Sequence, residues 1–172
     1  MRLFIAFTLP SEPLRSIQQL LSTQGIRYTK TFHCTLAFLR DTSSSQIHTI
    51  TERLNTVSFS TFTVTLSHFN FFPDTHNFRV IFIALEPQET IIHLHQSISK
   101  ALYPLFIPDK PFVPHITIAR VSFHTPHLLR EIPKKPPYLS FPITSFALIQ
   151  STLTSSGPVY ATLQQYPLRT LH

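Results

Sequence analysis

The chain has 172 residues, of which 42% are hydrophobic and 13% are charged, and its formal net charge is +6 at pH 7. This length and apolar content suit one domain, residues 1–172, or two small lobes that share a core. The sparse positive charge suits a polyanionic partner, although solubility alone would also explain it. With only two glycines and one cysteine, the sequence excludes a glycine-rich nucleotide-binding loop and an intramolecular disulfide framework.

The first ten residues contain one arginine followed by a short apolar run. An amphipathic helical pattern follows, without a small-residue cleavage site, so we predict a buried strand here rather than a signal peptide. No stretch approaches the roughly 20 apolar residues of a membrane span. We therefore expect a cytoplasmic protein without membrane association, and the lone Cys34 favours a reducing compartment.

Further elements follow in chain order, and strands alternate with amphipathic helices. The first helix begins after Pro10 and ends at Gly25 as its C-cap. After it we predict a strand over 32–39, a helix around 47–54, a hairpin of strands 62–71 and 79–85, a helix over 89–103, a strand over 115–121, and strands over 141–152 and 159–166. This order favours an α+β protein of two similar lobes around a shared cleft.

Two of the predicted strands carry one chemical pattern, a histidine and a threonine two residues apart with apolar residues between and after them. The segments are His33-Cys34-Thr35-Leu36 and His115-Ile116-Thr117-Ile118. About 0.2 such segments would arise by chance at this composition, and two are present. Because alternate side chains of a strand point to opposite faces, each histidine shares a face with its threonine while the apolar residues point to the core.

This residue set suits acid–base chemistry on a phosphodiester. A neutral imidazole can accept a proton from water near pH 7, and a protonated one can give a proton to a leaving oxygen. We predict that His33 and His115 form this pair. The hydroxyls of Thr35 and Thr117 would stabilise negative charge on the phosphate oxygens.

Other interpretations stay open at this point. His33 and His115 could be ordinary core or surface histidines, and the basic, aromatic-rich chain could be a non-catalytic module that binds single-stranded RNA. A metal site is disfavoured, because neither of two further histidine pairs has evident additional ligands. These pairs are His93 with His95 and His124 with His127. Cys34 is poorly placed as a nucleophile, since alternation turns it away from His33.

The paired motifs do not stand alone. The opening 2–6, the stretch 72–73 leading to 79–82, the extended second motif 114–120 and the segment 156–160 together resemble the 2H phosphoesterases. Within them the chain is most similar to the RNA 2′,3′-cyclic phosphodiesterases, also called 2′-5′ RNA ligases, over essentially its whole length. One departure is Arg40, where the family usually has glycine after Phe-Leu.

The resemblance implies a bilobal fold whose antiparallel sheets face a central cleft, with helices outside. It implies hydrolysis of RNA 2′,3′-cyclic phosphate ends to 2′-phosphates, with His33 as proton donor and His115 as proton acceptor, and slow ATP-independent ligation of certain RNAs. RNA ends or cyclic nucleotides would be the partners, without metal or cofactor, and we expect a monomer. It also places Arg120 at the phosphate, although strand alternation would turn Arg120 away from Thr117 unless the strand is bulged.

Overall fold

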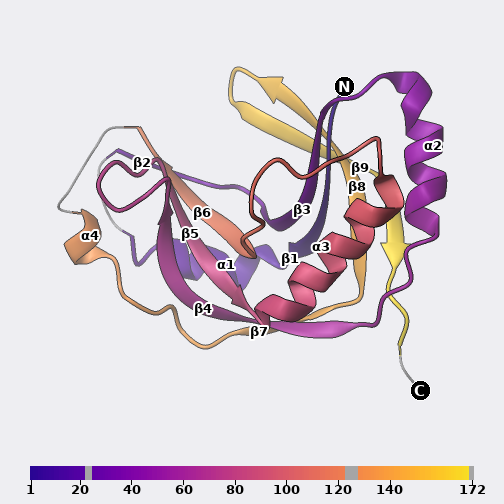
Figure 1. The fold of residues 1–172 in the computed structure, drawn as a ribbon. Coiled ribbons are helices and arrows are strands. Elements are labelled where there is room, and N and C mark those ends of the chain that lie inside the picture. The colour runs from indigo at the N-terminus through magenta and orange to yellow at the C-terminus, as the bar shows by residue number, and fades with distance from the viewer. Residues whose placement is uncertain (22–24, 123–127, 171–172) are drawn as a thin grey trace.

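The computed structural model describes residues 1–21, 25–122 and 128–170. The structure contains the predicted strands and helices together with two short elements, β2 and α4, that were not predicted (Figure 1). In chain order they are β1 (Arg2–Leu9), α1 (Ser11–Gln18), β2 (Ile26–Tyr28), β3 (Phe32–Asp41), α2 (Ser44–Asn55), β4 (Phe62–Phe72), β5 (Val80–Glu86), α3 (Gln88–Leu102), β6 (His115–Val121), α4 (Leu128–Glu131), β7 (Ser140–Ile143), β8 (Ser145–Thr154) and β9 (Gly157–Pro167).

The strands form two antiparallel sheets, which confirms the predicted α+β architecture. One sheet has the order β3-β1-β8-β9, and the other has the order β2-β6-β5-β4-β7. Helix α1 packs on β6 of the five-stranded sheet, whereas α3 contacts β3, β5 and α2. Figure 1 shows the two sheets side by side, with α2 and α3 beside the four-stranded one. The predicted hairpin of β4 and β5 is present.

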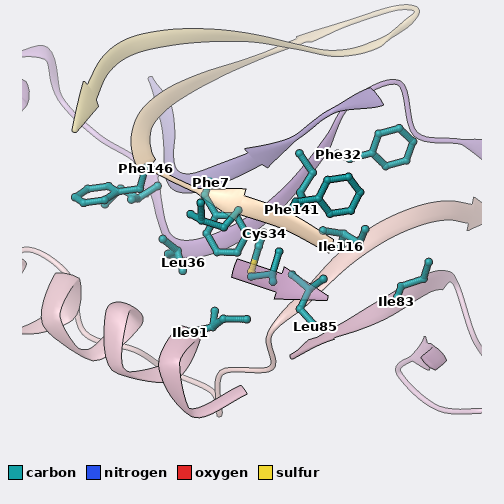
Figure 2. Packing of buried hydrophobic residues seen from close by; sticks show 14 of the residues in the cluster. Phe7, Phe32, Cys34, Leu36, Ile83, Leu85, Ile91, Ile116, Phe141 and Phe146 are labelled. Atoms are coloured by element: carbon teal, nitrogen blue, oxygen red, sulfur yellow. The ribbon is translucent and has the colours of Figure 1, made fainter. Parts of the chain in front are cut away.

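The core forms because central strands are apolar on both faces, as burial on both sides requires. In β1 the residues from Leu3 to Phe7 are all buried, and in β5 those from Ile81 to Leu85. One continuous cluster draws side chains from both sheets and from α1, α2 and α3. Figure 2 shows part of this cluster, with side chains from both sheets and Ile91 from α3. A second, smaller cluster on the other face of the four-stranded sheet consists of Phe4, Ala6, Ala147 and Ile149, with Tyr160 packed against it.

Two predicted boundaries are wrong. Helix α1 ends at Gln18 rather than at Gly25, and Leu20 is 47% exposed beyond its end. Residues 141–152 form two strands in different sheets, β7 beside β4 and β8 beside β1. The chain changes sheets at Thr144, whose carbonyl accepts a hydrogen bond from the Leu168 backbone at 2.8 Å instead of joining a ladder. Helices within the described ranges are too short or too polar to cross a membrane.

Strands β3 and β6 each contain a bulge directly after the His-x-Thr motif. Along β3, Ala6 pairs with Thr35 and Ile5 with Ala37, so Leu36 is the extra residue. Along β6, Phe82 pairs with Thr117 and Ile81 with Ala119, so Ile118 is the extra residue. A bulge of this kind shifts the side-chain alternation of the residues that follow it by one position.

Candidate active site

All five residues that the sequence singles out line one cavity of about 340 Å³ between the two sheets. They are His33, Thr35, His115, Thr117 and Arg120. The first two lie on β3 and the other three on β6. Their apolar neighbours Cys34, Leu36, Ile116 and Ile118 are buried in the core beneath them.

The bulge in β6 resolves the orientation of Arg120. In an unbroken strand, Arg120 would point away from Thr117, because the two residues are three positions apart. Because Ile118 is an extra residue, Ile118 and Ala119 are both buried. The side chain of Arg120 therefore lines the cavity. The cavity therefore holds a fixed positive charge beside two hydroxyls and two imidazoles.

Aromatic rings flank each histidine. The His33 ring lies 5.2 Å from the ring of Phe4 and 5.3 Å from that of Tyr160. The His115 ring lies 5.0 Å from the ring of Phe72 and 5.1 Å from that of Phe82, and these two phenylalanines stack on each other at 4.1 Å. Such contacts restrict ring rotation and remove water from the imidazoles.

Burial and charge both favour neutral imidazoles in the free protein. Burial lowers the pKa of His33 to about 4, and the neighbouring His115 and Arg120 act in the same direction. Burial also lowers the pKa of His115, against the opposing effect of its hydrogen bond to the Val113 carbonyl. Near pH 7 both rings are therefore neutral in the free protein.

A hydrogen bond to the backbone fixes which ring nitrogen of His115 carries the hydrogen. Nδ1 of His115 lies 2.7 Å from the Val113 carbonyl oxygen. A carbonyl can only accept, so Nδ1 carries the hydrogen and donates it. When the ring is neutral, its Nε2 is unprotonated and can act as a base.

Among the described residues, the structure adds seven lining residues that were not predicted as site residues, although four of them lie in the segments 2–6 and 156–160 that carry the resemblance. All seven belong to the four-stranded sheet. They are Arg2, Phe4, Phe38, Ser151, Leu153, Pro158 and Tyr160. The guanidinium of Arg2 lies over the ring of Phe38, 5.4 Å from its centroid. No periodicity marks these residues, because the pairing of β1, β3, β8 and β9 brings them together across long sequence separations.

The other histidines that were considered as ligands do not join this cavity. His95 is buried on α3, where its ring stacks on Phe112, and the outward neighbour His93 is exposed. His124 and His127 lie outside the described residues. Among the residues that are described, no three histidine, cysteine or acidic side chains gather as a metal site. The Cys34 thiol is buried, which raises its pKa to about 12 and keeps it protonated.

Comparisons with known proteins match this chain over most of its length. The family model described as the 2′-5′ RNA ligase superfamily matches residues 9–154. An Archaeoglobus fulgidus protein named RNA 2′,3′-cyclic phosphodiesterase is 29% identical, over 96% of this chain and 99% of that protein. An Aquifex aeolicus protein of the same name is 30% identical, over 79% of this chain and 77% of that one.

Solved structures agree with the fold. A crystal structure of a Thermus thermophilus protein superimposes with a TM-score of 0.83 at 29% identity, and all of both chains is covered. The crystal structure of E. coli LigT complexed with 3′-AMP has a TM-score of 0.82 at 25% identity, over 97% of each chain.

Proposed function

Because this chain belongs to the 2′-5′ RNA ligase superfamily, we propose that it hydrolyses RNA 2′,3′-cyclic phosphate ends to 2′-phosphates. The observation that carries the proposal is the meeting of both His-x-Thr pairs with Arg120 in one cavity. Curated relatives at 29% and 28% identity over nearly the whole chain are named RNA 2′,3′-cyclic phosphodiesterases.

In the proposed reaction, a water oxygen attacks the phosphorus while Nε2 of His115 removes a proton from that water. The bond between phosphorus and O3′ breaks, and protonated His33 delivers its proton to O3′. The phosphate thus stays on O2′, and the two histidines exchange protonation states until solvent restores them. The hydrogen bond that fixes the Nδ1 hydrogen of His115 supports its role as the base.

His33 must carry a proton to act as the acid, although burial lowers its pKa to about 4 in the free protein. The negative charge of a phosphodiester beside His33 would raise this pKa, because it stabilises the imidazolium against burial and offsets the positive charge of Arg120. Substrate binding would then favour the protonated form of His33. We propose this assignment because the resemblance places the donor at His33.

Thr35, Thr117 and Arg120 supply the electrostatic part of the mechanism. Their hydroxyls and guanidinium face the cavity from both strands and would donate to the non-bridging oxygens, which gain negative charge during attack. Arg120 can bind two such oxygens at once through its planar fork of donors.

The asymmetry of the cavity indicates how the nucleotide would lie. Among the described residues, the apolar lining comes from the four-stranded sheet, through Phe4, Phe38, Leu153, Pro158 and Tyr160. Leu153 and Phe38 are 64% and 40% exposed, so a ribose or base could cover them. We propose that the nucleoside rests on this sheet while the cyclic phosphate contacts both motifs.

We also propose ligation as a slow reversible activity of the same site. If the 5′-hydroxyl of a second RNA replaces water, His115 removes its proton and the displaced O3′ takes one from His33. The product is a 2′-5′ phosphodiester, and no nucleotide energy source is needed because the cyclic phosphate supplies the leaving group. The partners in both directions are RNA ends or cyclic nucleotides.

The competing proposal is a module that binds single-stranded RNA without turnover. Incubation of purified protein with a 2′,3′-cyclic nucleotide in EDTA separates the two, with 31P NMR to identify the product. We expect a 2′-phosphate. Binding without any product would reject the enzyme, and activity only after a divalent metal is restored would reject the metal-free mechanism.

A further inference from the structure

Two buried polar side chains occupy corresponding positions behind the two motifs. Gln18 on α1 is 5% exposed and His95 on α3 is 9% exposed. Among the described residues, only Thr42 joins them as a buried polar side chain. Burial of a polar group is costly unless it is hydrogen-bonded, so the partners of these two residues indicate why they are there.

Both side chains bind the carbonyl of a bulged residue. Nδ1 of His95 lies 2.6 Å from the Leu36 carbonyl oxygen, and Nε2 of Gln18 lies 2.8 Å from the Ile118 carbonyl oxygen. Leu36 and Ile118 are the extra residues of β3 and β6, each directly after the threonine of its motif. Since a bulged residue leaves the regular ladder, its carbonyl needs a partner from elsewhere.

Further contacts support each of these two hydrogen bonds. The His95 ring stacks on Phe112, at 4.3 Å and 10°, in the segment that leads into His115. Gln18 also donates to the Thr29 carbonyl at 2.9 Å, and the Thr29 hydroxyl donates to the Ile118 carbonyl at 3.0 Å. His95 therefore contacts the backbone directly after the first motif and the segment that precedes the second motif.

The bulges decide what enters the cavity after each threonine. Phe38 and Arg120 both lie three residues beyond their threonine, and both line the cavity because one extra residue precedes them. We propose that Gln18 and His95 are positioning residues, which hold the two bulges and thereby aim Arg120 and Phe38, with the preceding threonines, at the bound phosphate and nucleoside. This inference rests on the proposed function for its substrate, and neither residue touches the cavity itself.

The test compares substitutions that remove the hydrogen-bond donor with one that keeps a donor and with apolar controls. Gln18→Met removes the Nε2 donor, and Thr29→Val removes the second donor to the same carbonyl. His95→Phe keeps a ring against Phe112 and removes Nδ1, whereas His95→Asn keeps a donor near the Nδ1 position and removes the ring. Ile17→Val and Ile98→Val on the same helices are the matched controls for a general loss of stability, because both are buried and apolar.

The first readout is binding of 2′-AMP, a phosphomonoester product analogue that needs no turnover. If Gln18 aims Arg120, Gln18→Met and Arg120→Ala will each weaken binding about tenfold, and the double variant will be no weaker than Arg120→Ala alone. His95→Phe combined with Arg120→Ala will instead show additive losses. Additive losses for the Gln18 pair would overturn its assignment.

The second readout is the pKa of His33, followed by NMR of its imidazole. Burial is the main cause of the lowered His33 pKa, and His115 and Arg120 add smaller effects in the same direction. Withdrawal of Arg120 in Gln18→Met will therefore raise this pKa by a small amount, and the two control variants will leave it unchanged. For His95, kcat will fall about 10- to 100-fold in His95→Phe and will recover in part in His95→Asn. Equal losses in both His95 variants, or an unchanged His33 pKa in Gln18→Met, would contradict the positioning roles.

These measurements separate the two proposals. If the wild-type protein binds 2′-AMP with the expected coupling but turns over no cyclic phosphate, the proposed function fails and the Gln18 assignment stands. If turnover is present and the coupling is absent, the positioning role fails and the proposed function stands.

Discussion

Phe38 and Arg120 occupy equivalent places in the two lobes, each three residues after a motif threonine and each turned into the cavity by one bulged residue. Equivalent backbone positions thus carry an apolar ring in one lobe and a cation in the other. The guanidinium of Arg2 lies over the Phe38 ring, so a cation also accompanies the first of these positions. In the proposed binding mode, this difference would separate a nucleoside side from a phosphate side in an otherwise similar pair of motifs.

We expect Phe38 and Arg120 to act on different kinetic constants. Phe38→Ala removes a stacking surface, so KM for a cyclic nucleotide should rise about tenfold with little change in kcat. Arg120→Ala removes charge stabilisation that grows during attack, so kcat should fall about 10²-fold or more. Steady-state kinetics on 2′,3′-cyclic AMP check both values. A fall of kcat in Phe38→Ala as large as that in Arg120→Ala would contradict the division of roles.

His33→Ala and His115→Ala should each remove nearly all hydrolysis, because acid–base groups contribute about 10²- to 10⁴-fold each. A substrate whose 3′ leaving group needs no proton distinguishes the two. Its turnover should recover in His33→Ala and stay low in His115→Ala. Recovery in His115→Ala alone would reverse the assignment of donor and acceptor. Circular dichroism and thermal melting of both variants provide the check on folding.

The pH dependence should differ between kcat/KM and kcat. Both imidazoles have lowered pKa values in the free protein, and that of His33 is about 4, so the bell of kcat/KM should be centred below pH 6.5. Bound phosphodiester stabilises the protonated forms and raises these pKa values, so the bell of kcat should lie at higher pH. The limbs belong to the coupled pair rather than to either residue. A kcat/KM optimum above pH 7 would contradict this expectation.

His33 should also make the free protein less stable in acid. Its folded pKa is about 4 against 6.5 when unfolded, so between these values the unfolded chain binds more protons and stability falls as pH decreases. The loss should approach roughly 3 kcal/mol below pH 4. Urea unfolding of wild type and His33→Gln between pH 7 and 4 measures it. Equal pH slopes for the two proteins would show that His33 titrates normally.

Arg40 is the one described residue other than glycine with a left-handed backbone, at φ 58°. Its side chain forms an exposed ion pair with Asp109, which is worth about 0–1 kcal/mol, whereas a side chain at this φ costs about 1 kcal/mol. Arg40→Gly relieves the strain and loses the pair, while Arg40→Ala keeps the strain and loses the pair. We therefore expect Arg40→Gly to melt about 2–4 °C above Arg40→Ala. The reverse order would contradict a strained backbone.

Much of this molecule follows from local sequence. Apolar alternation and helical stripes predict most elements, and the His-x-Thr repeats predict which side chains leave the core, because side-chain direction within a strand depends only on neighbouring residues. The repeats alone therefore identify His33, Thr35, His115 and Thr117 as one set. The same local signals are too weak for β2 and α4, which are only three and four residues long.

The rest depends on contacts between distant segments. Whether 141–152 is one strand or two depends on which sheet each half joins, and the turn at Thr144 is stabilised by Leu168 from the end of the chain. The bulges at Leu36 and Ile118 exist only relative to their partner strands, so strand alternation alone sends Arg120 the wrong way. Local sequence therefore determined which side chains are the candidate reactive groups of this protein. Tertiary pairing decided how they face one another, because register and bulges arise from long-range hydrogen bonds and packing.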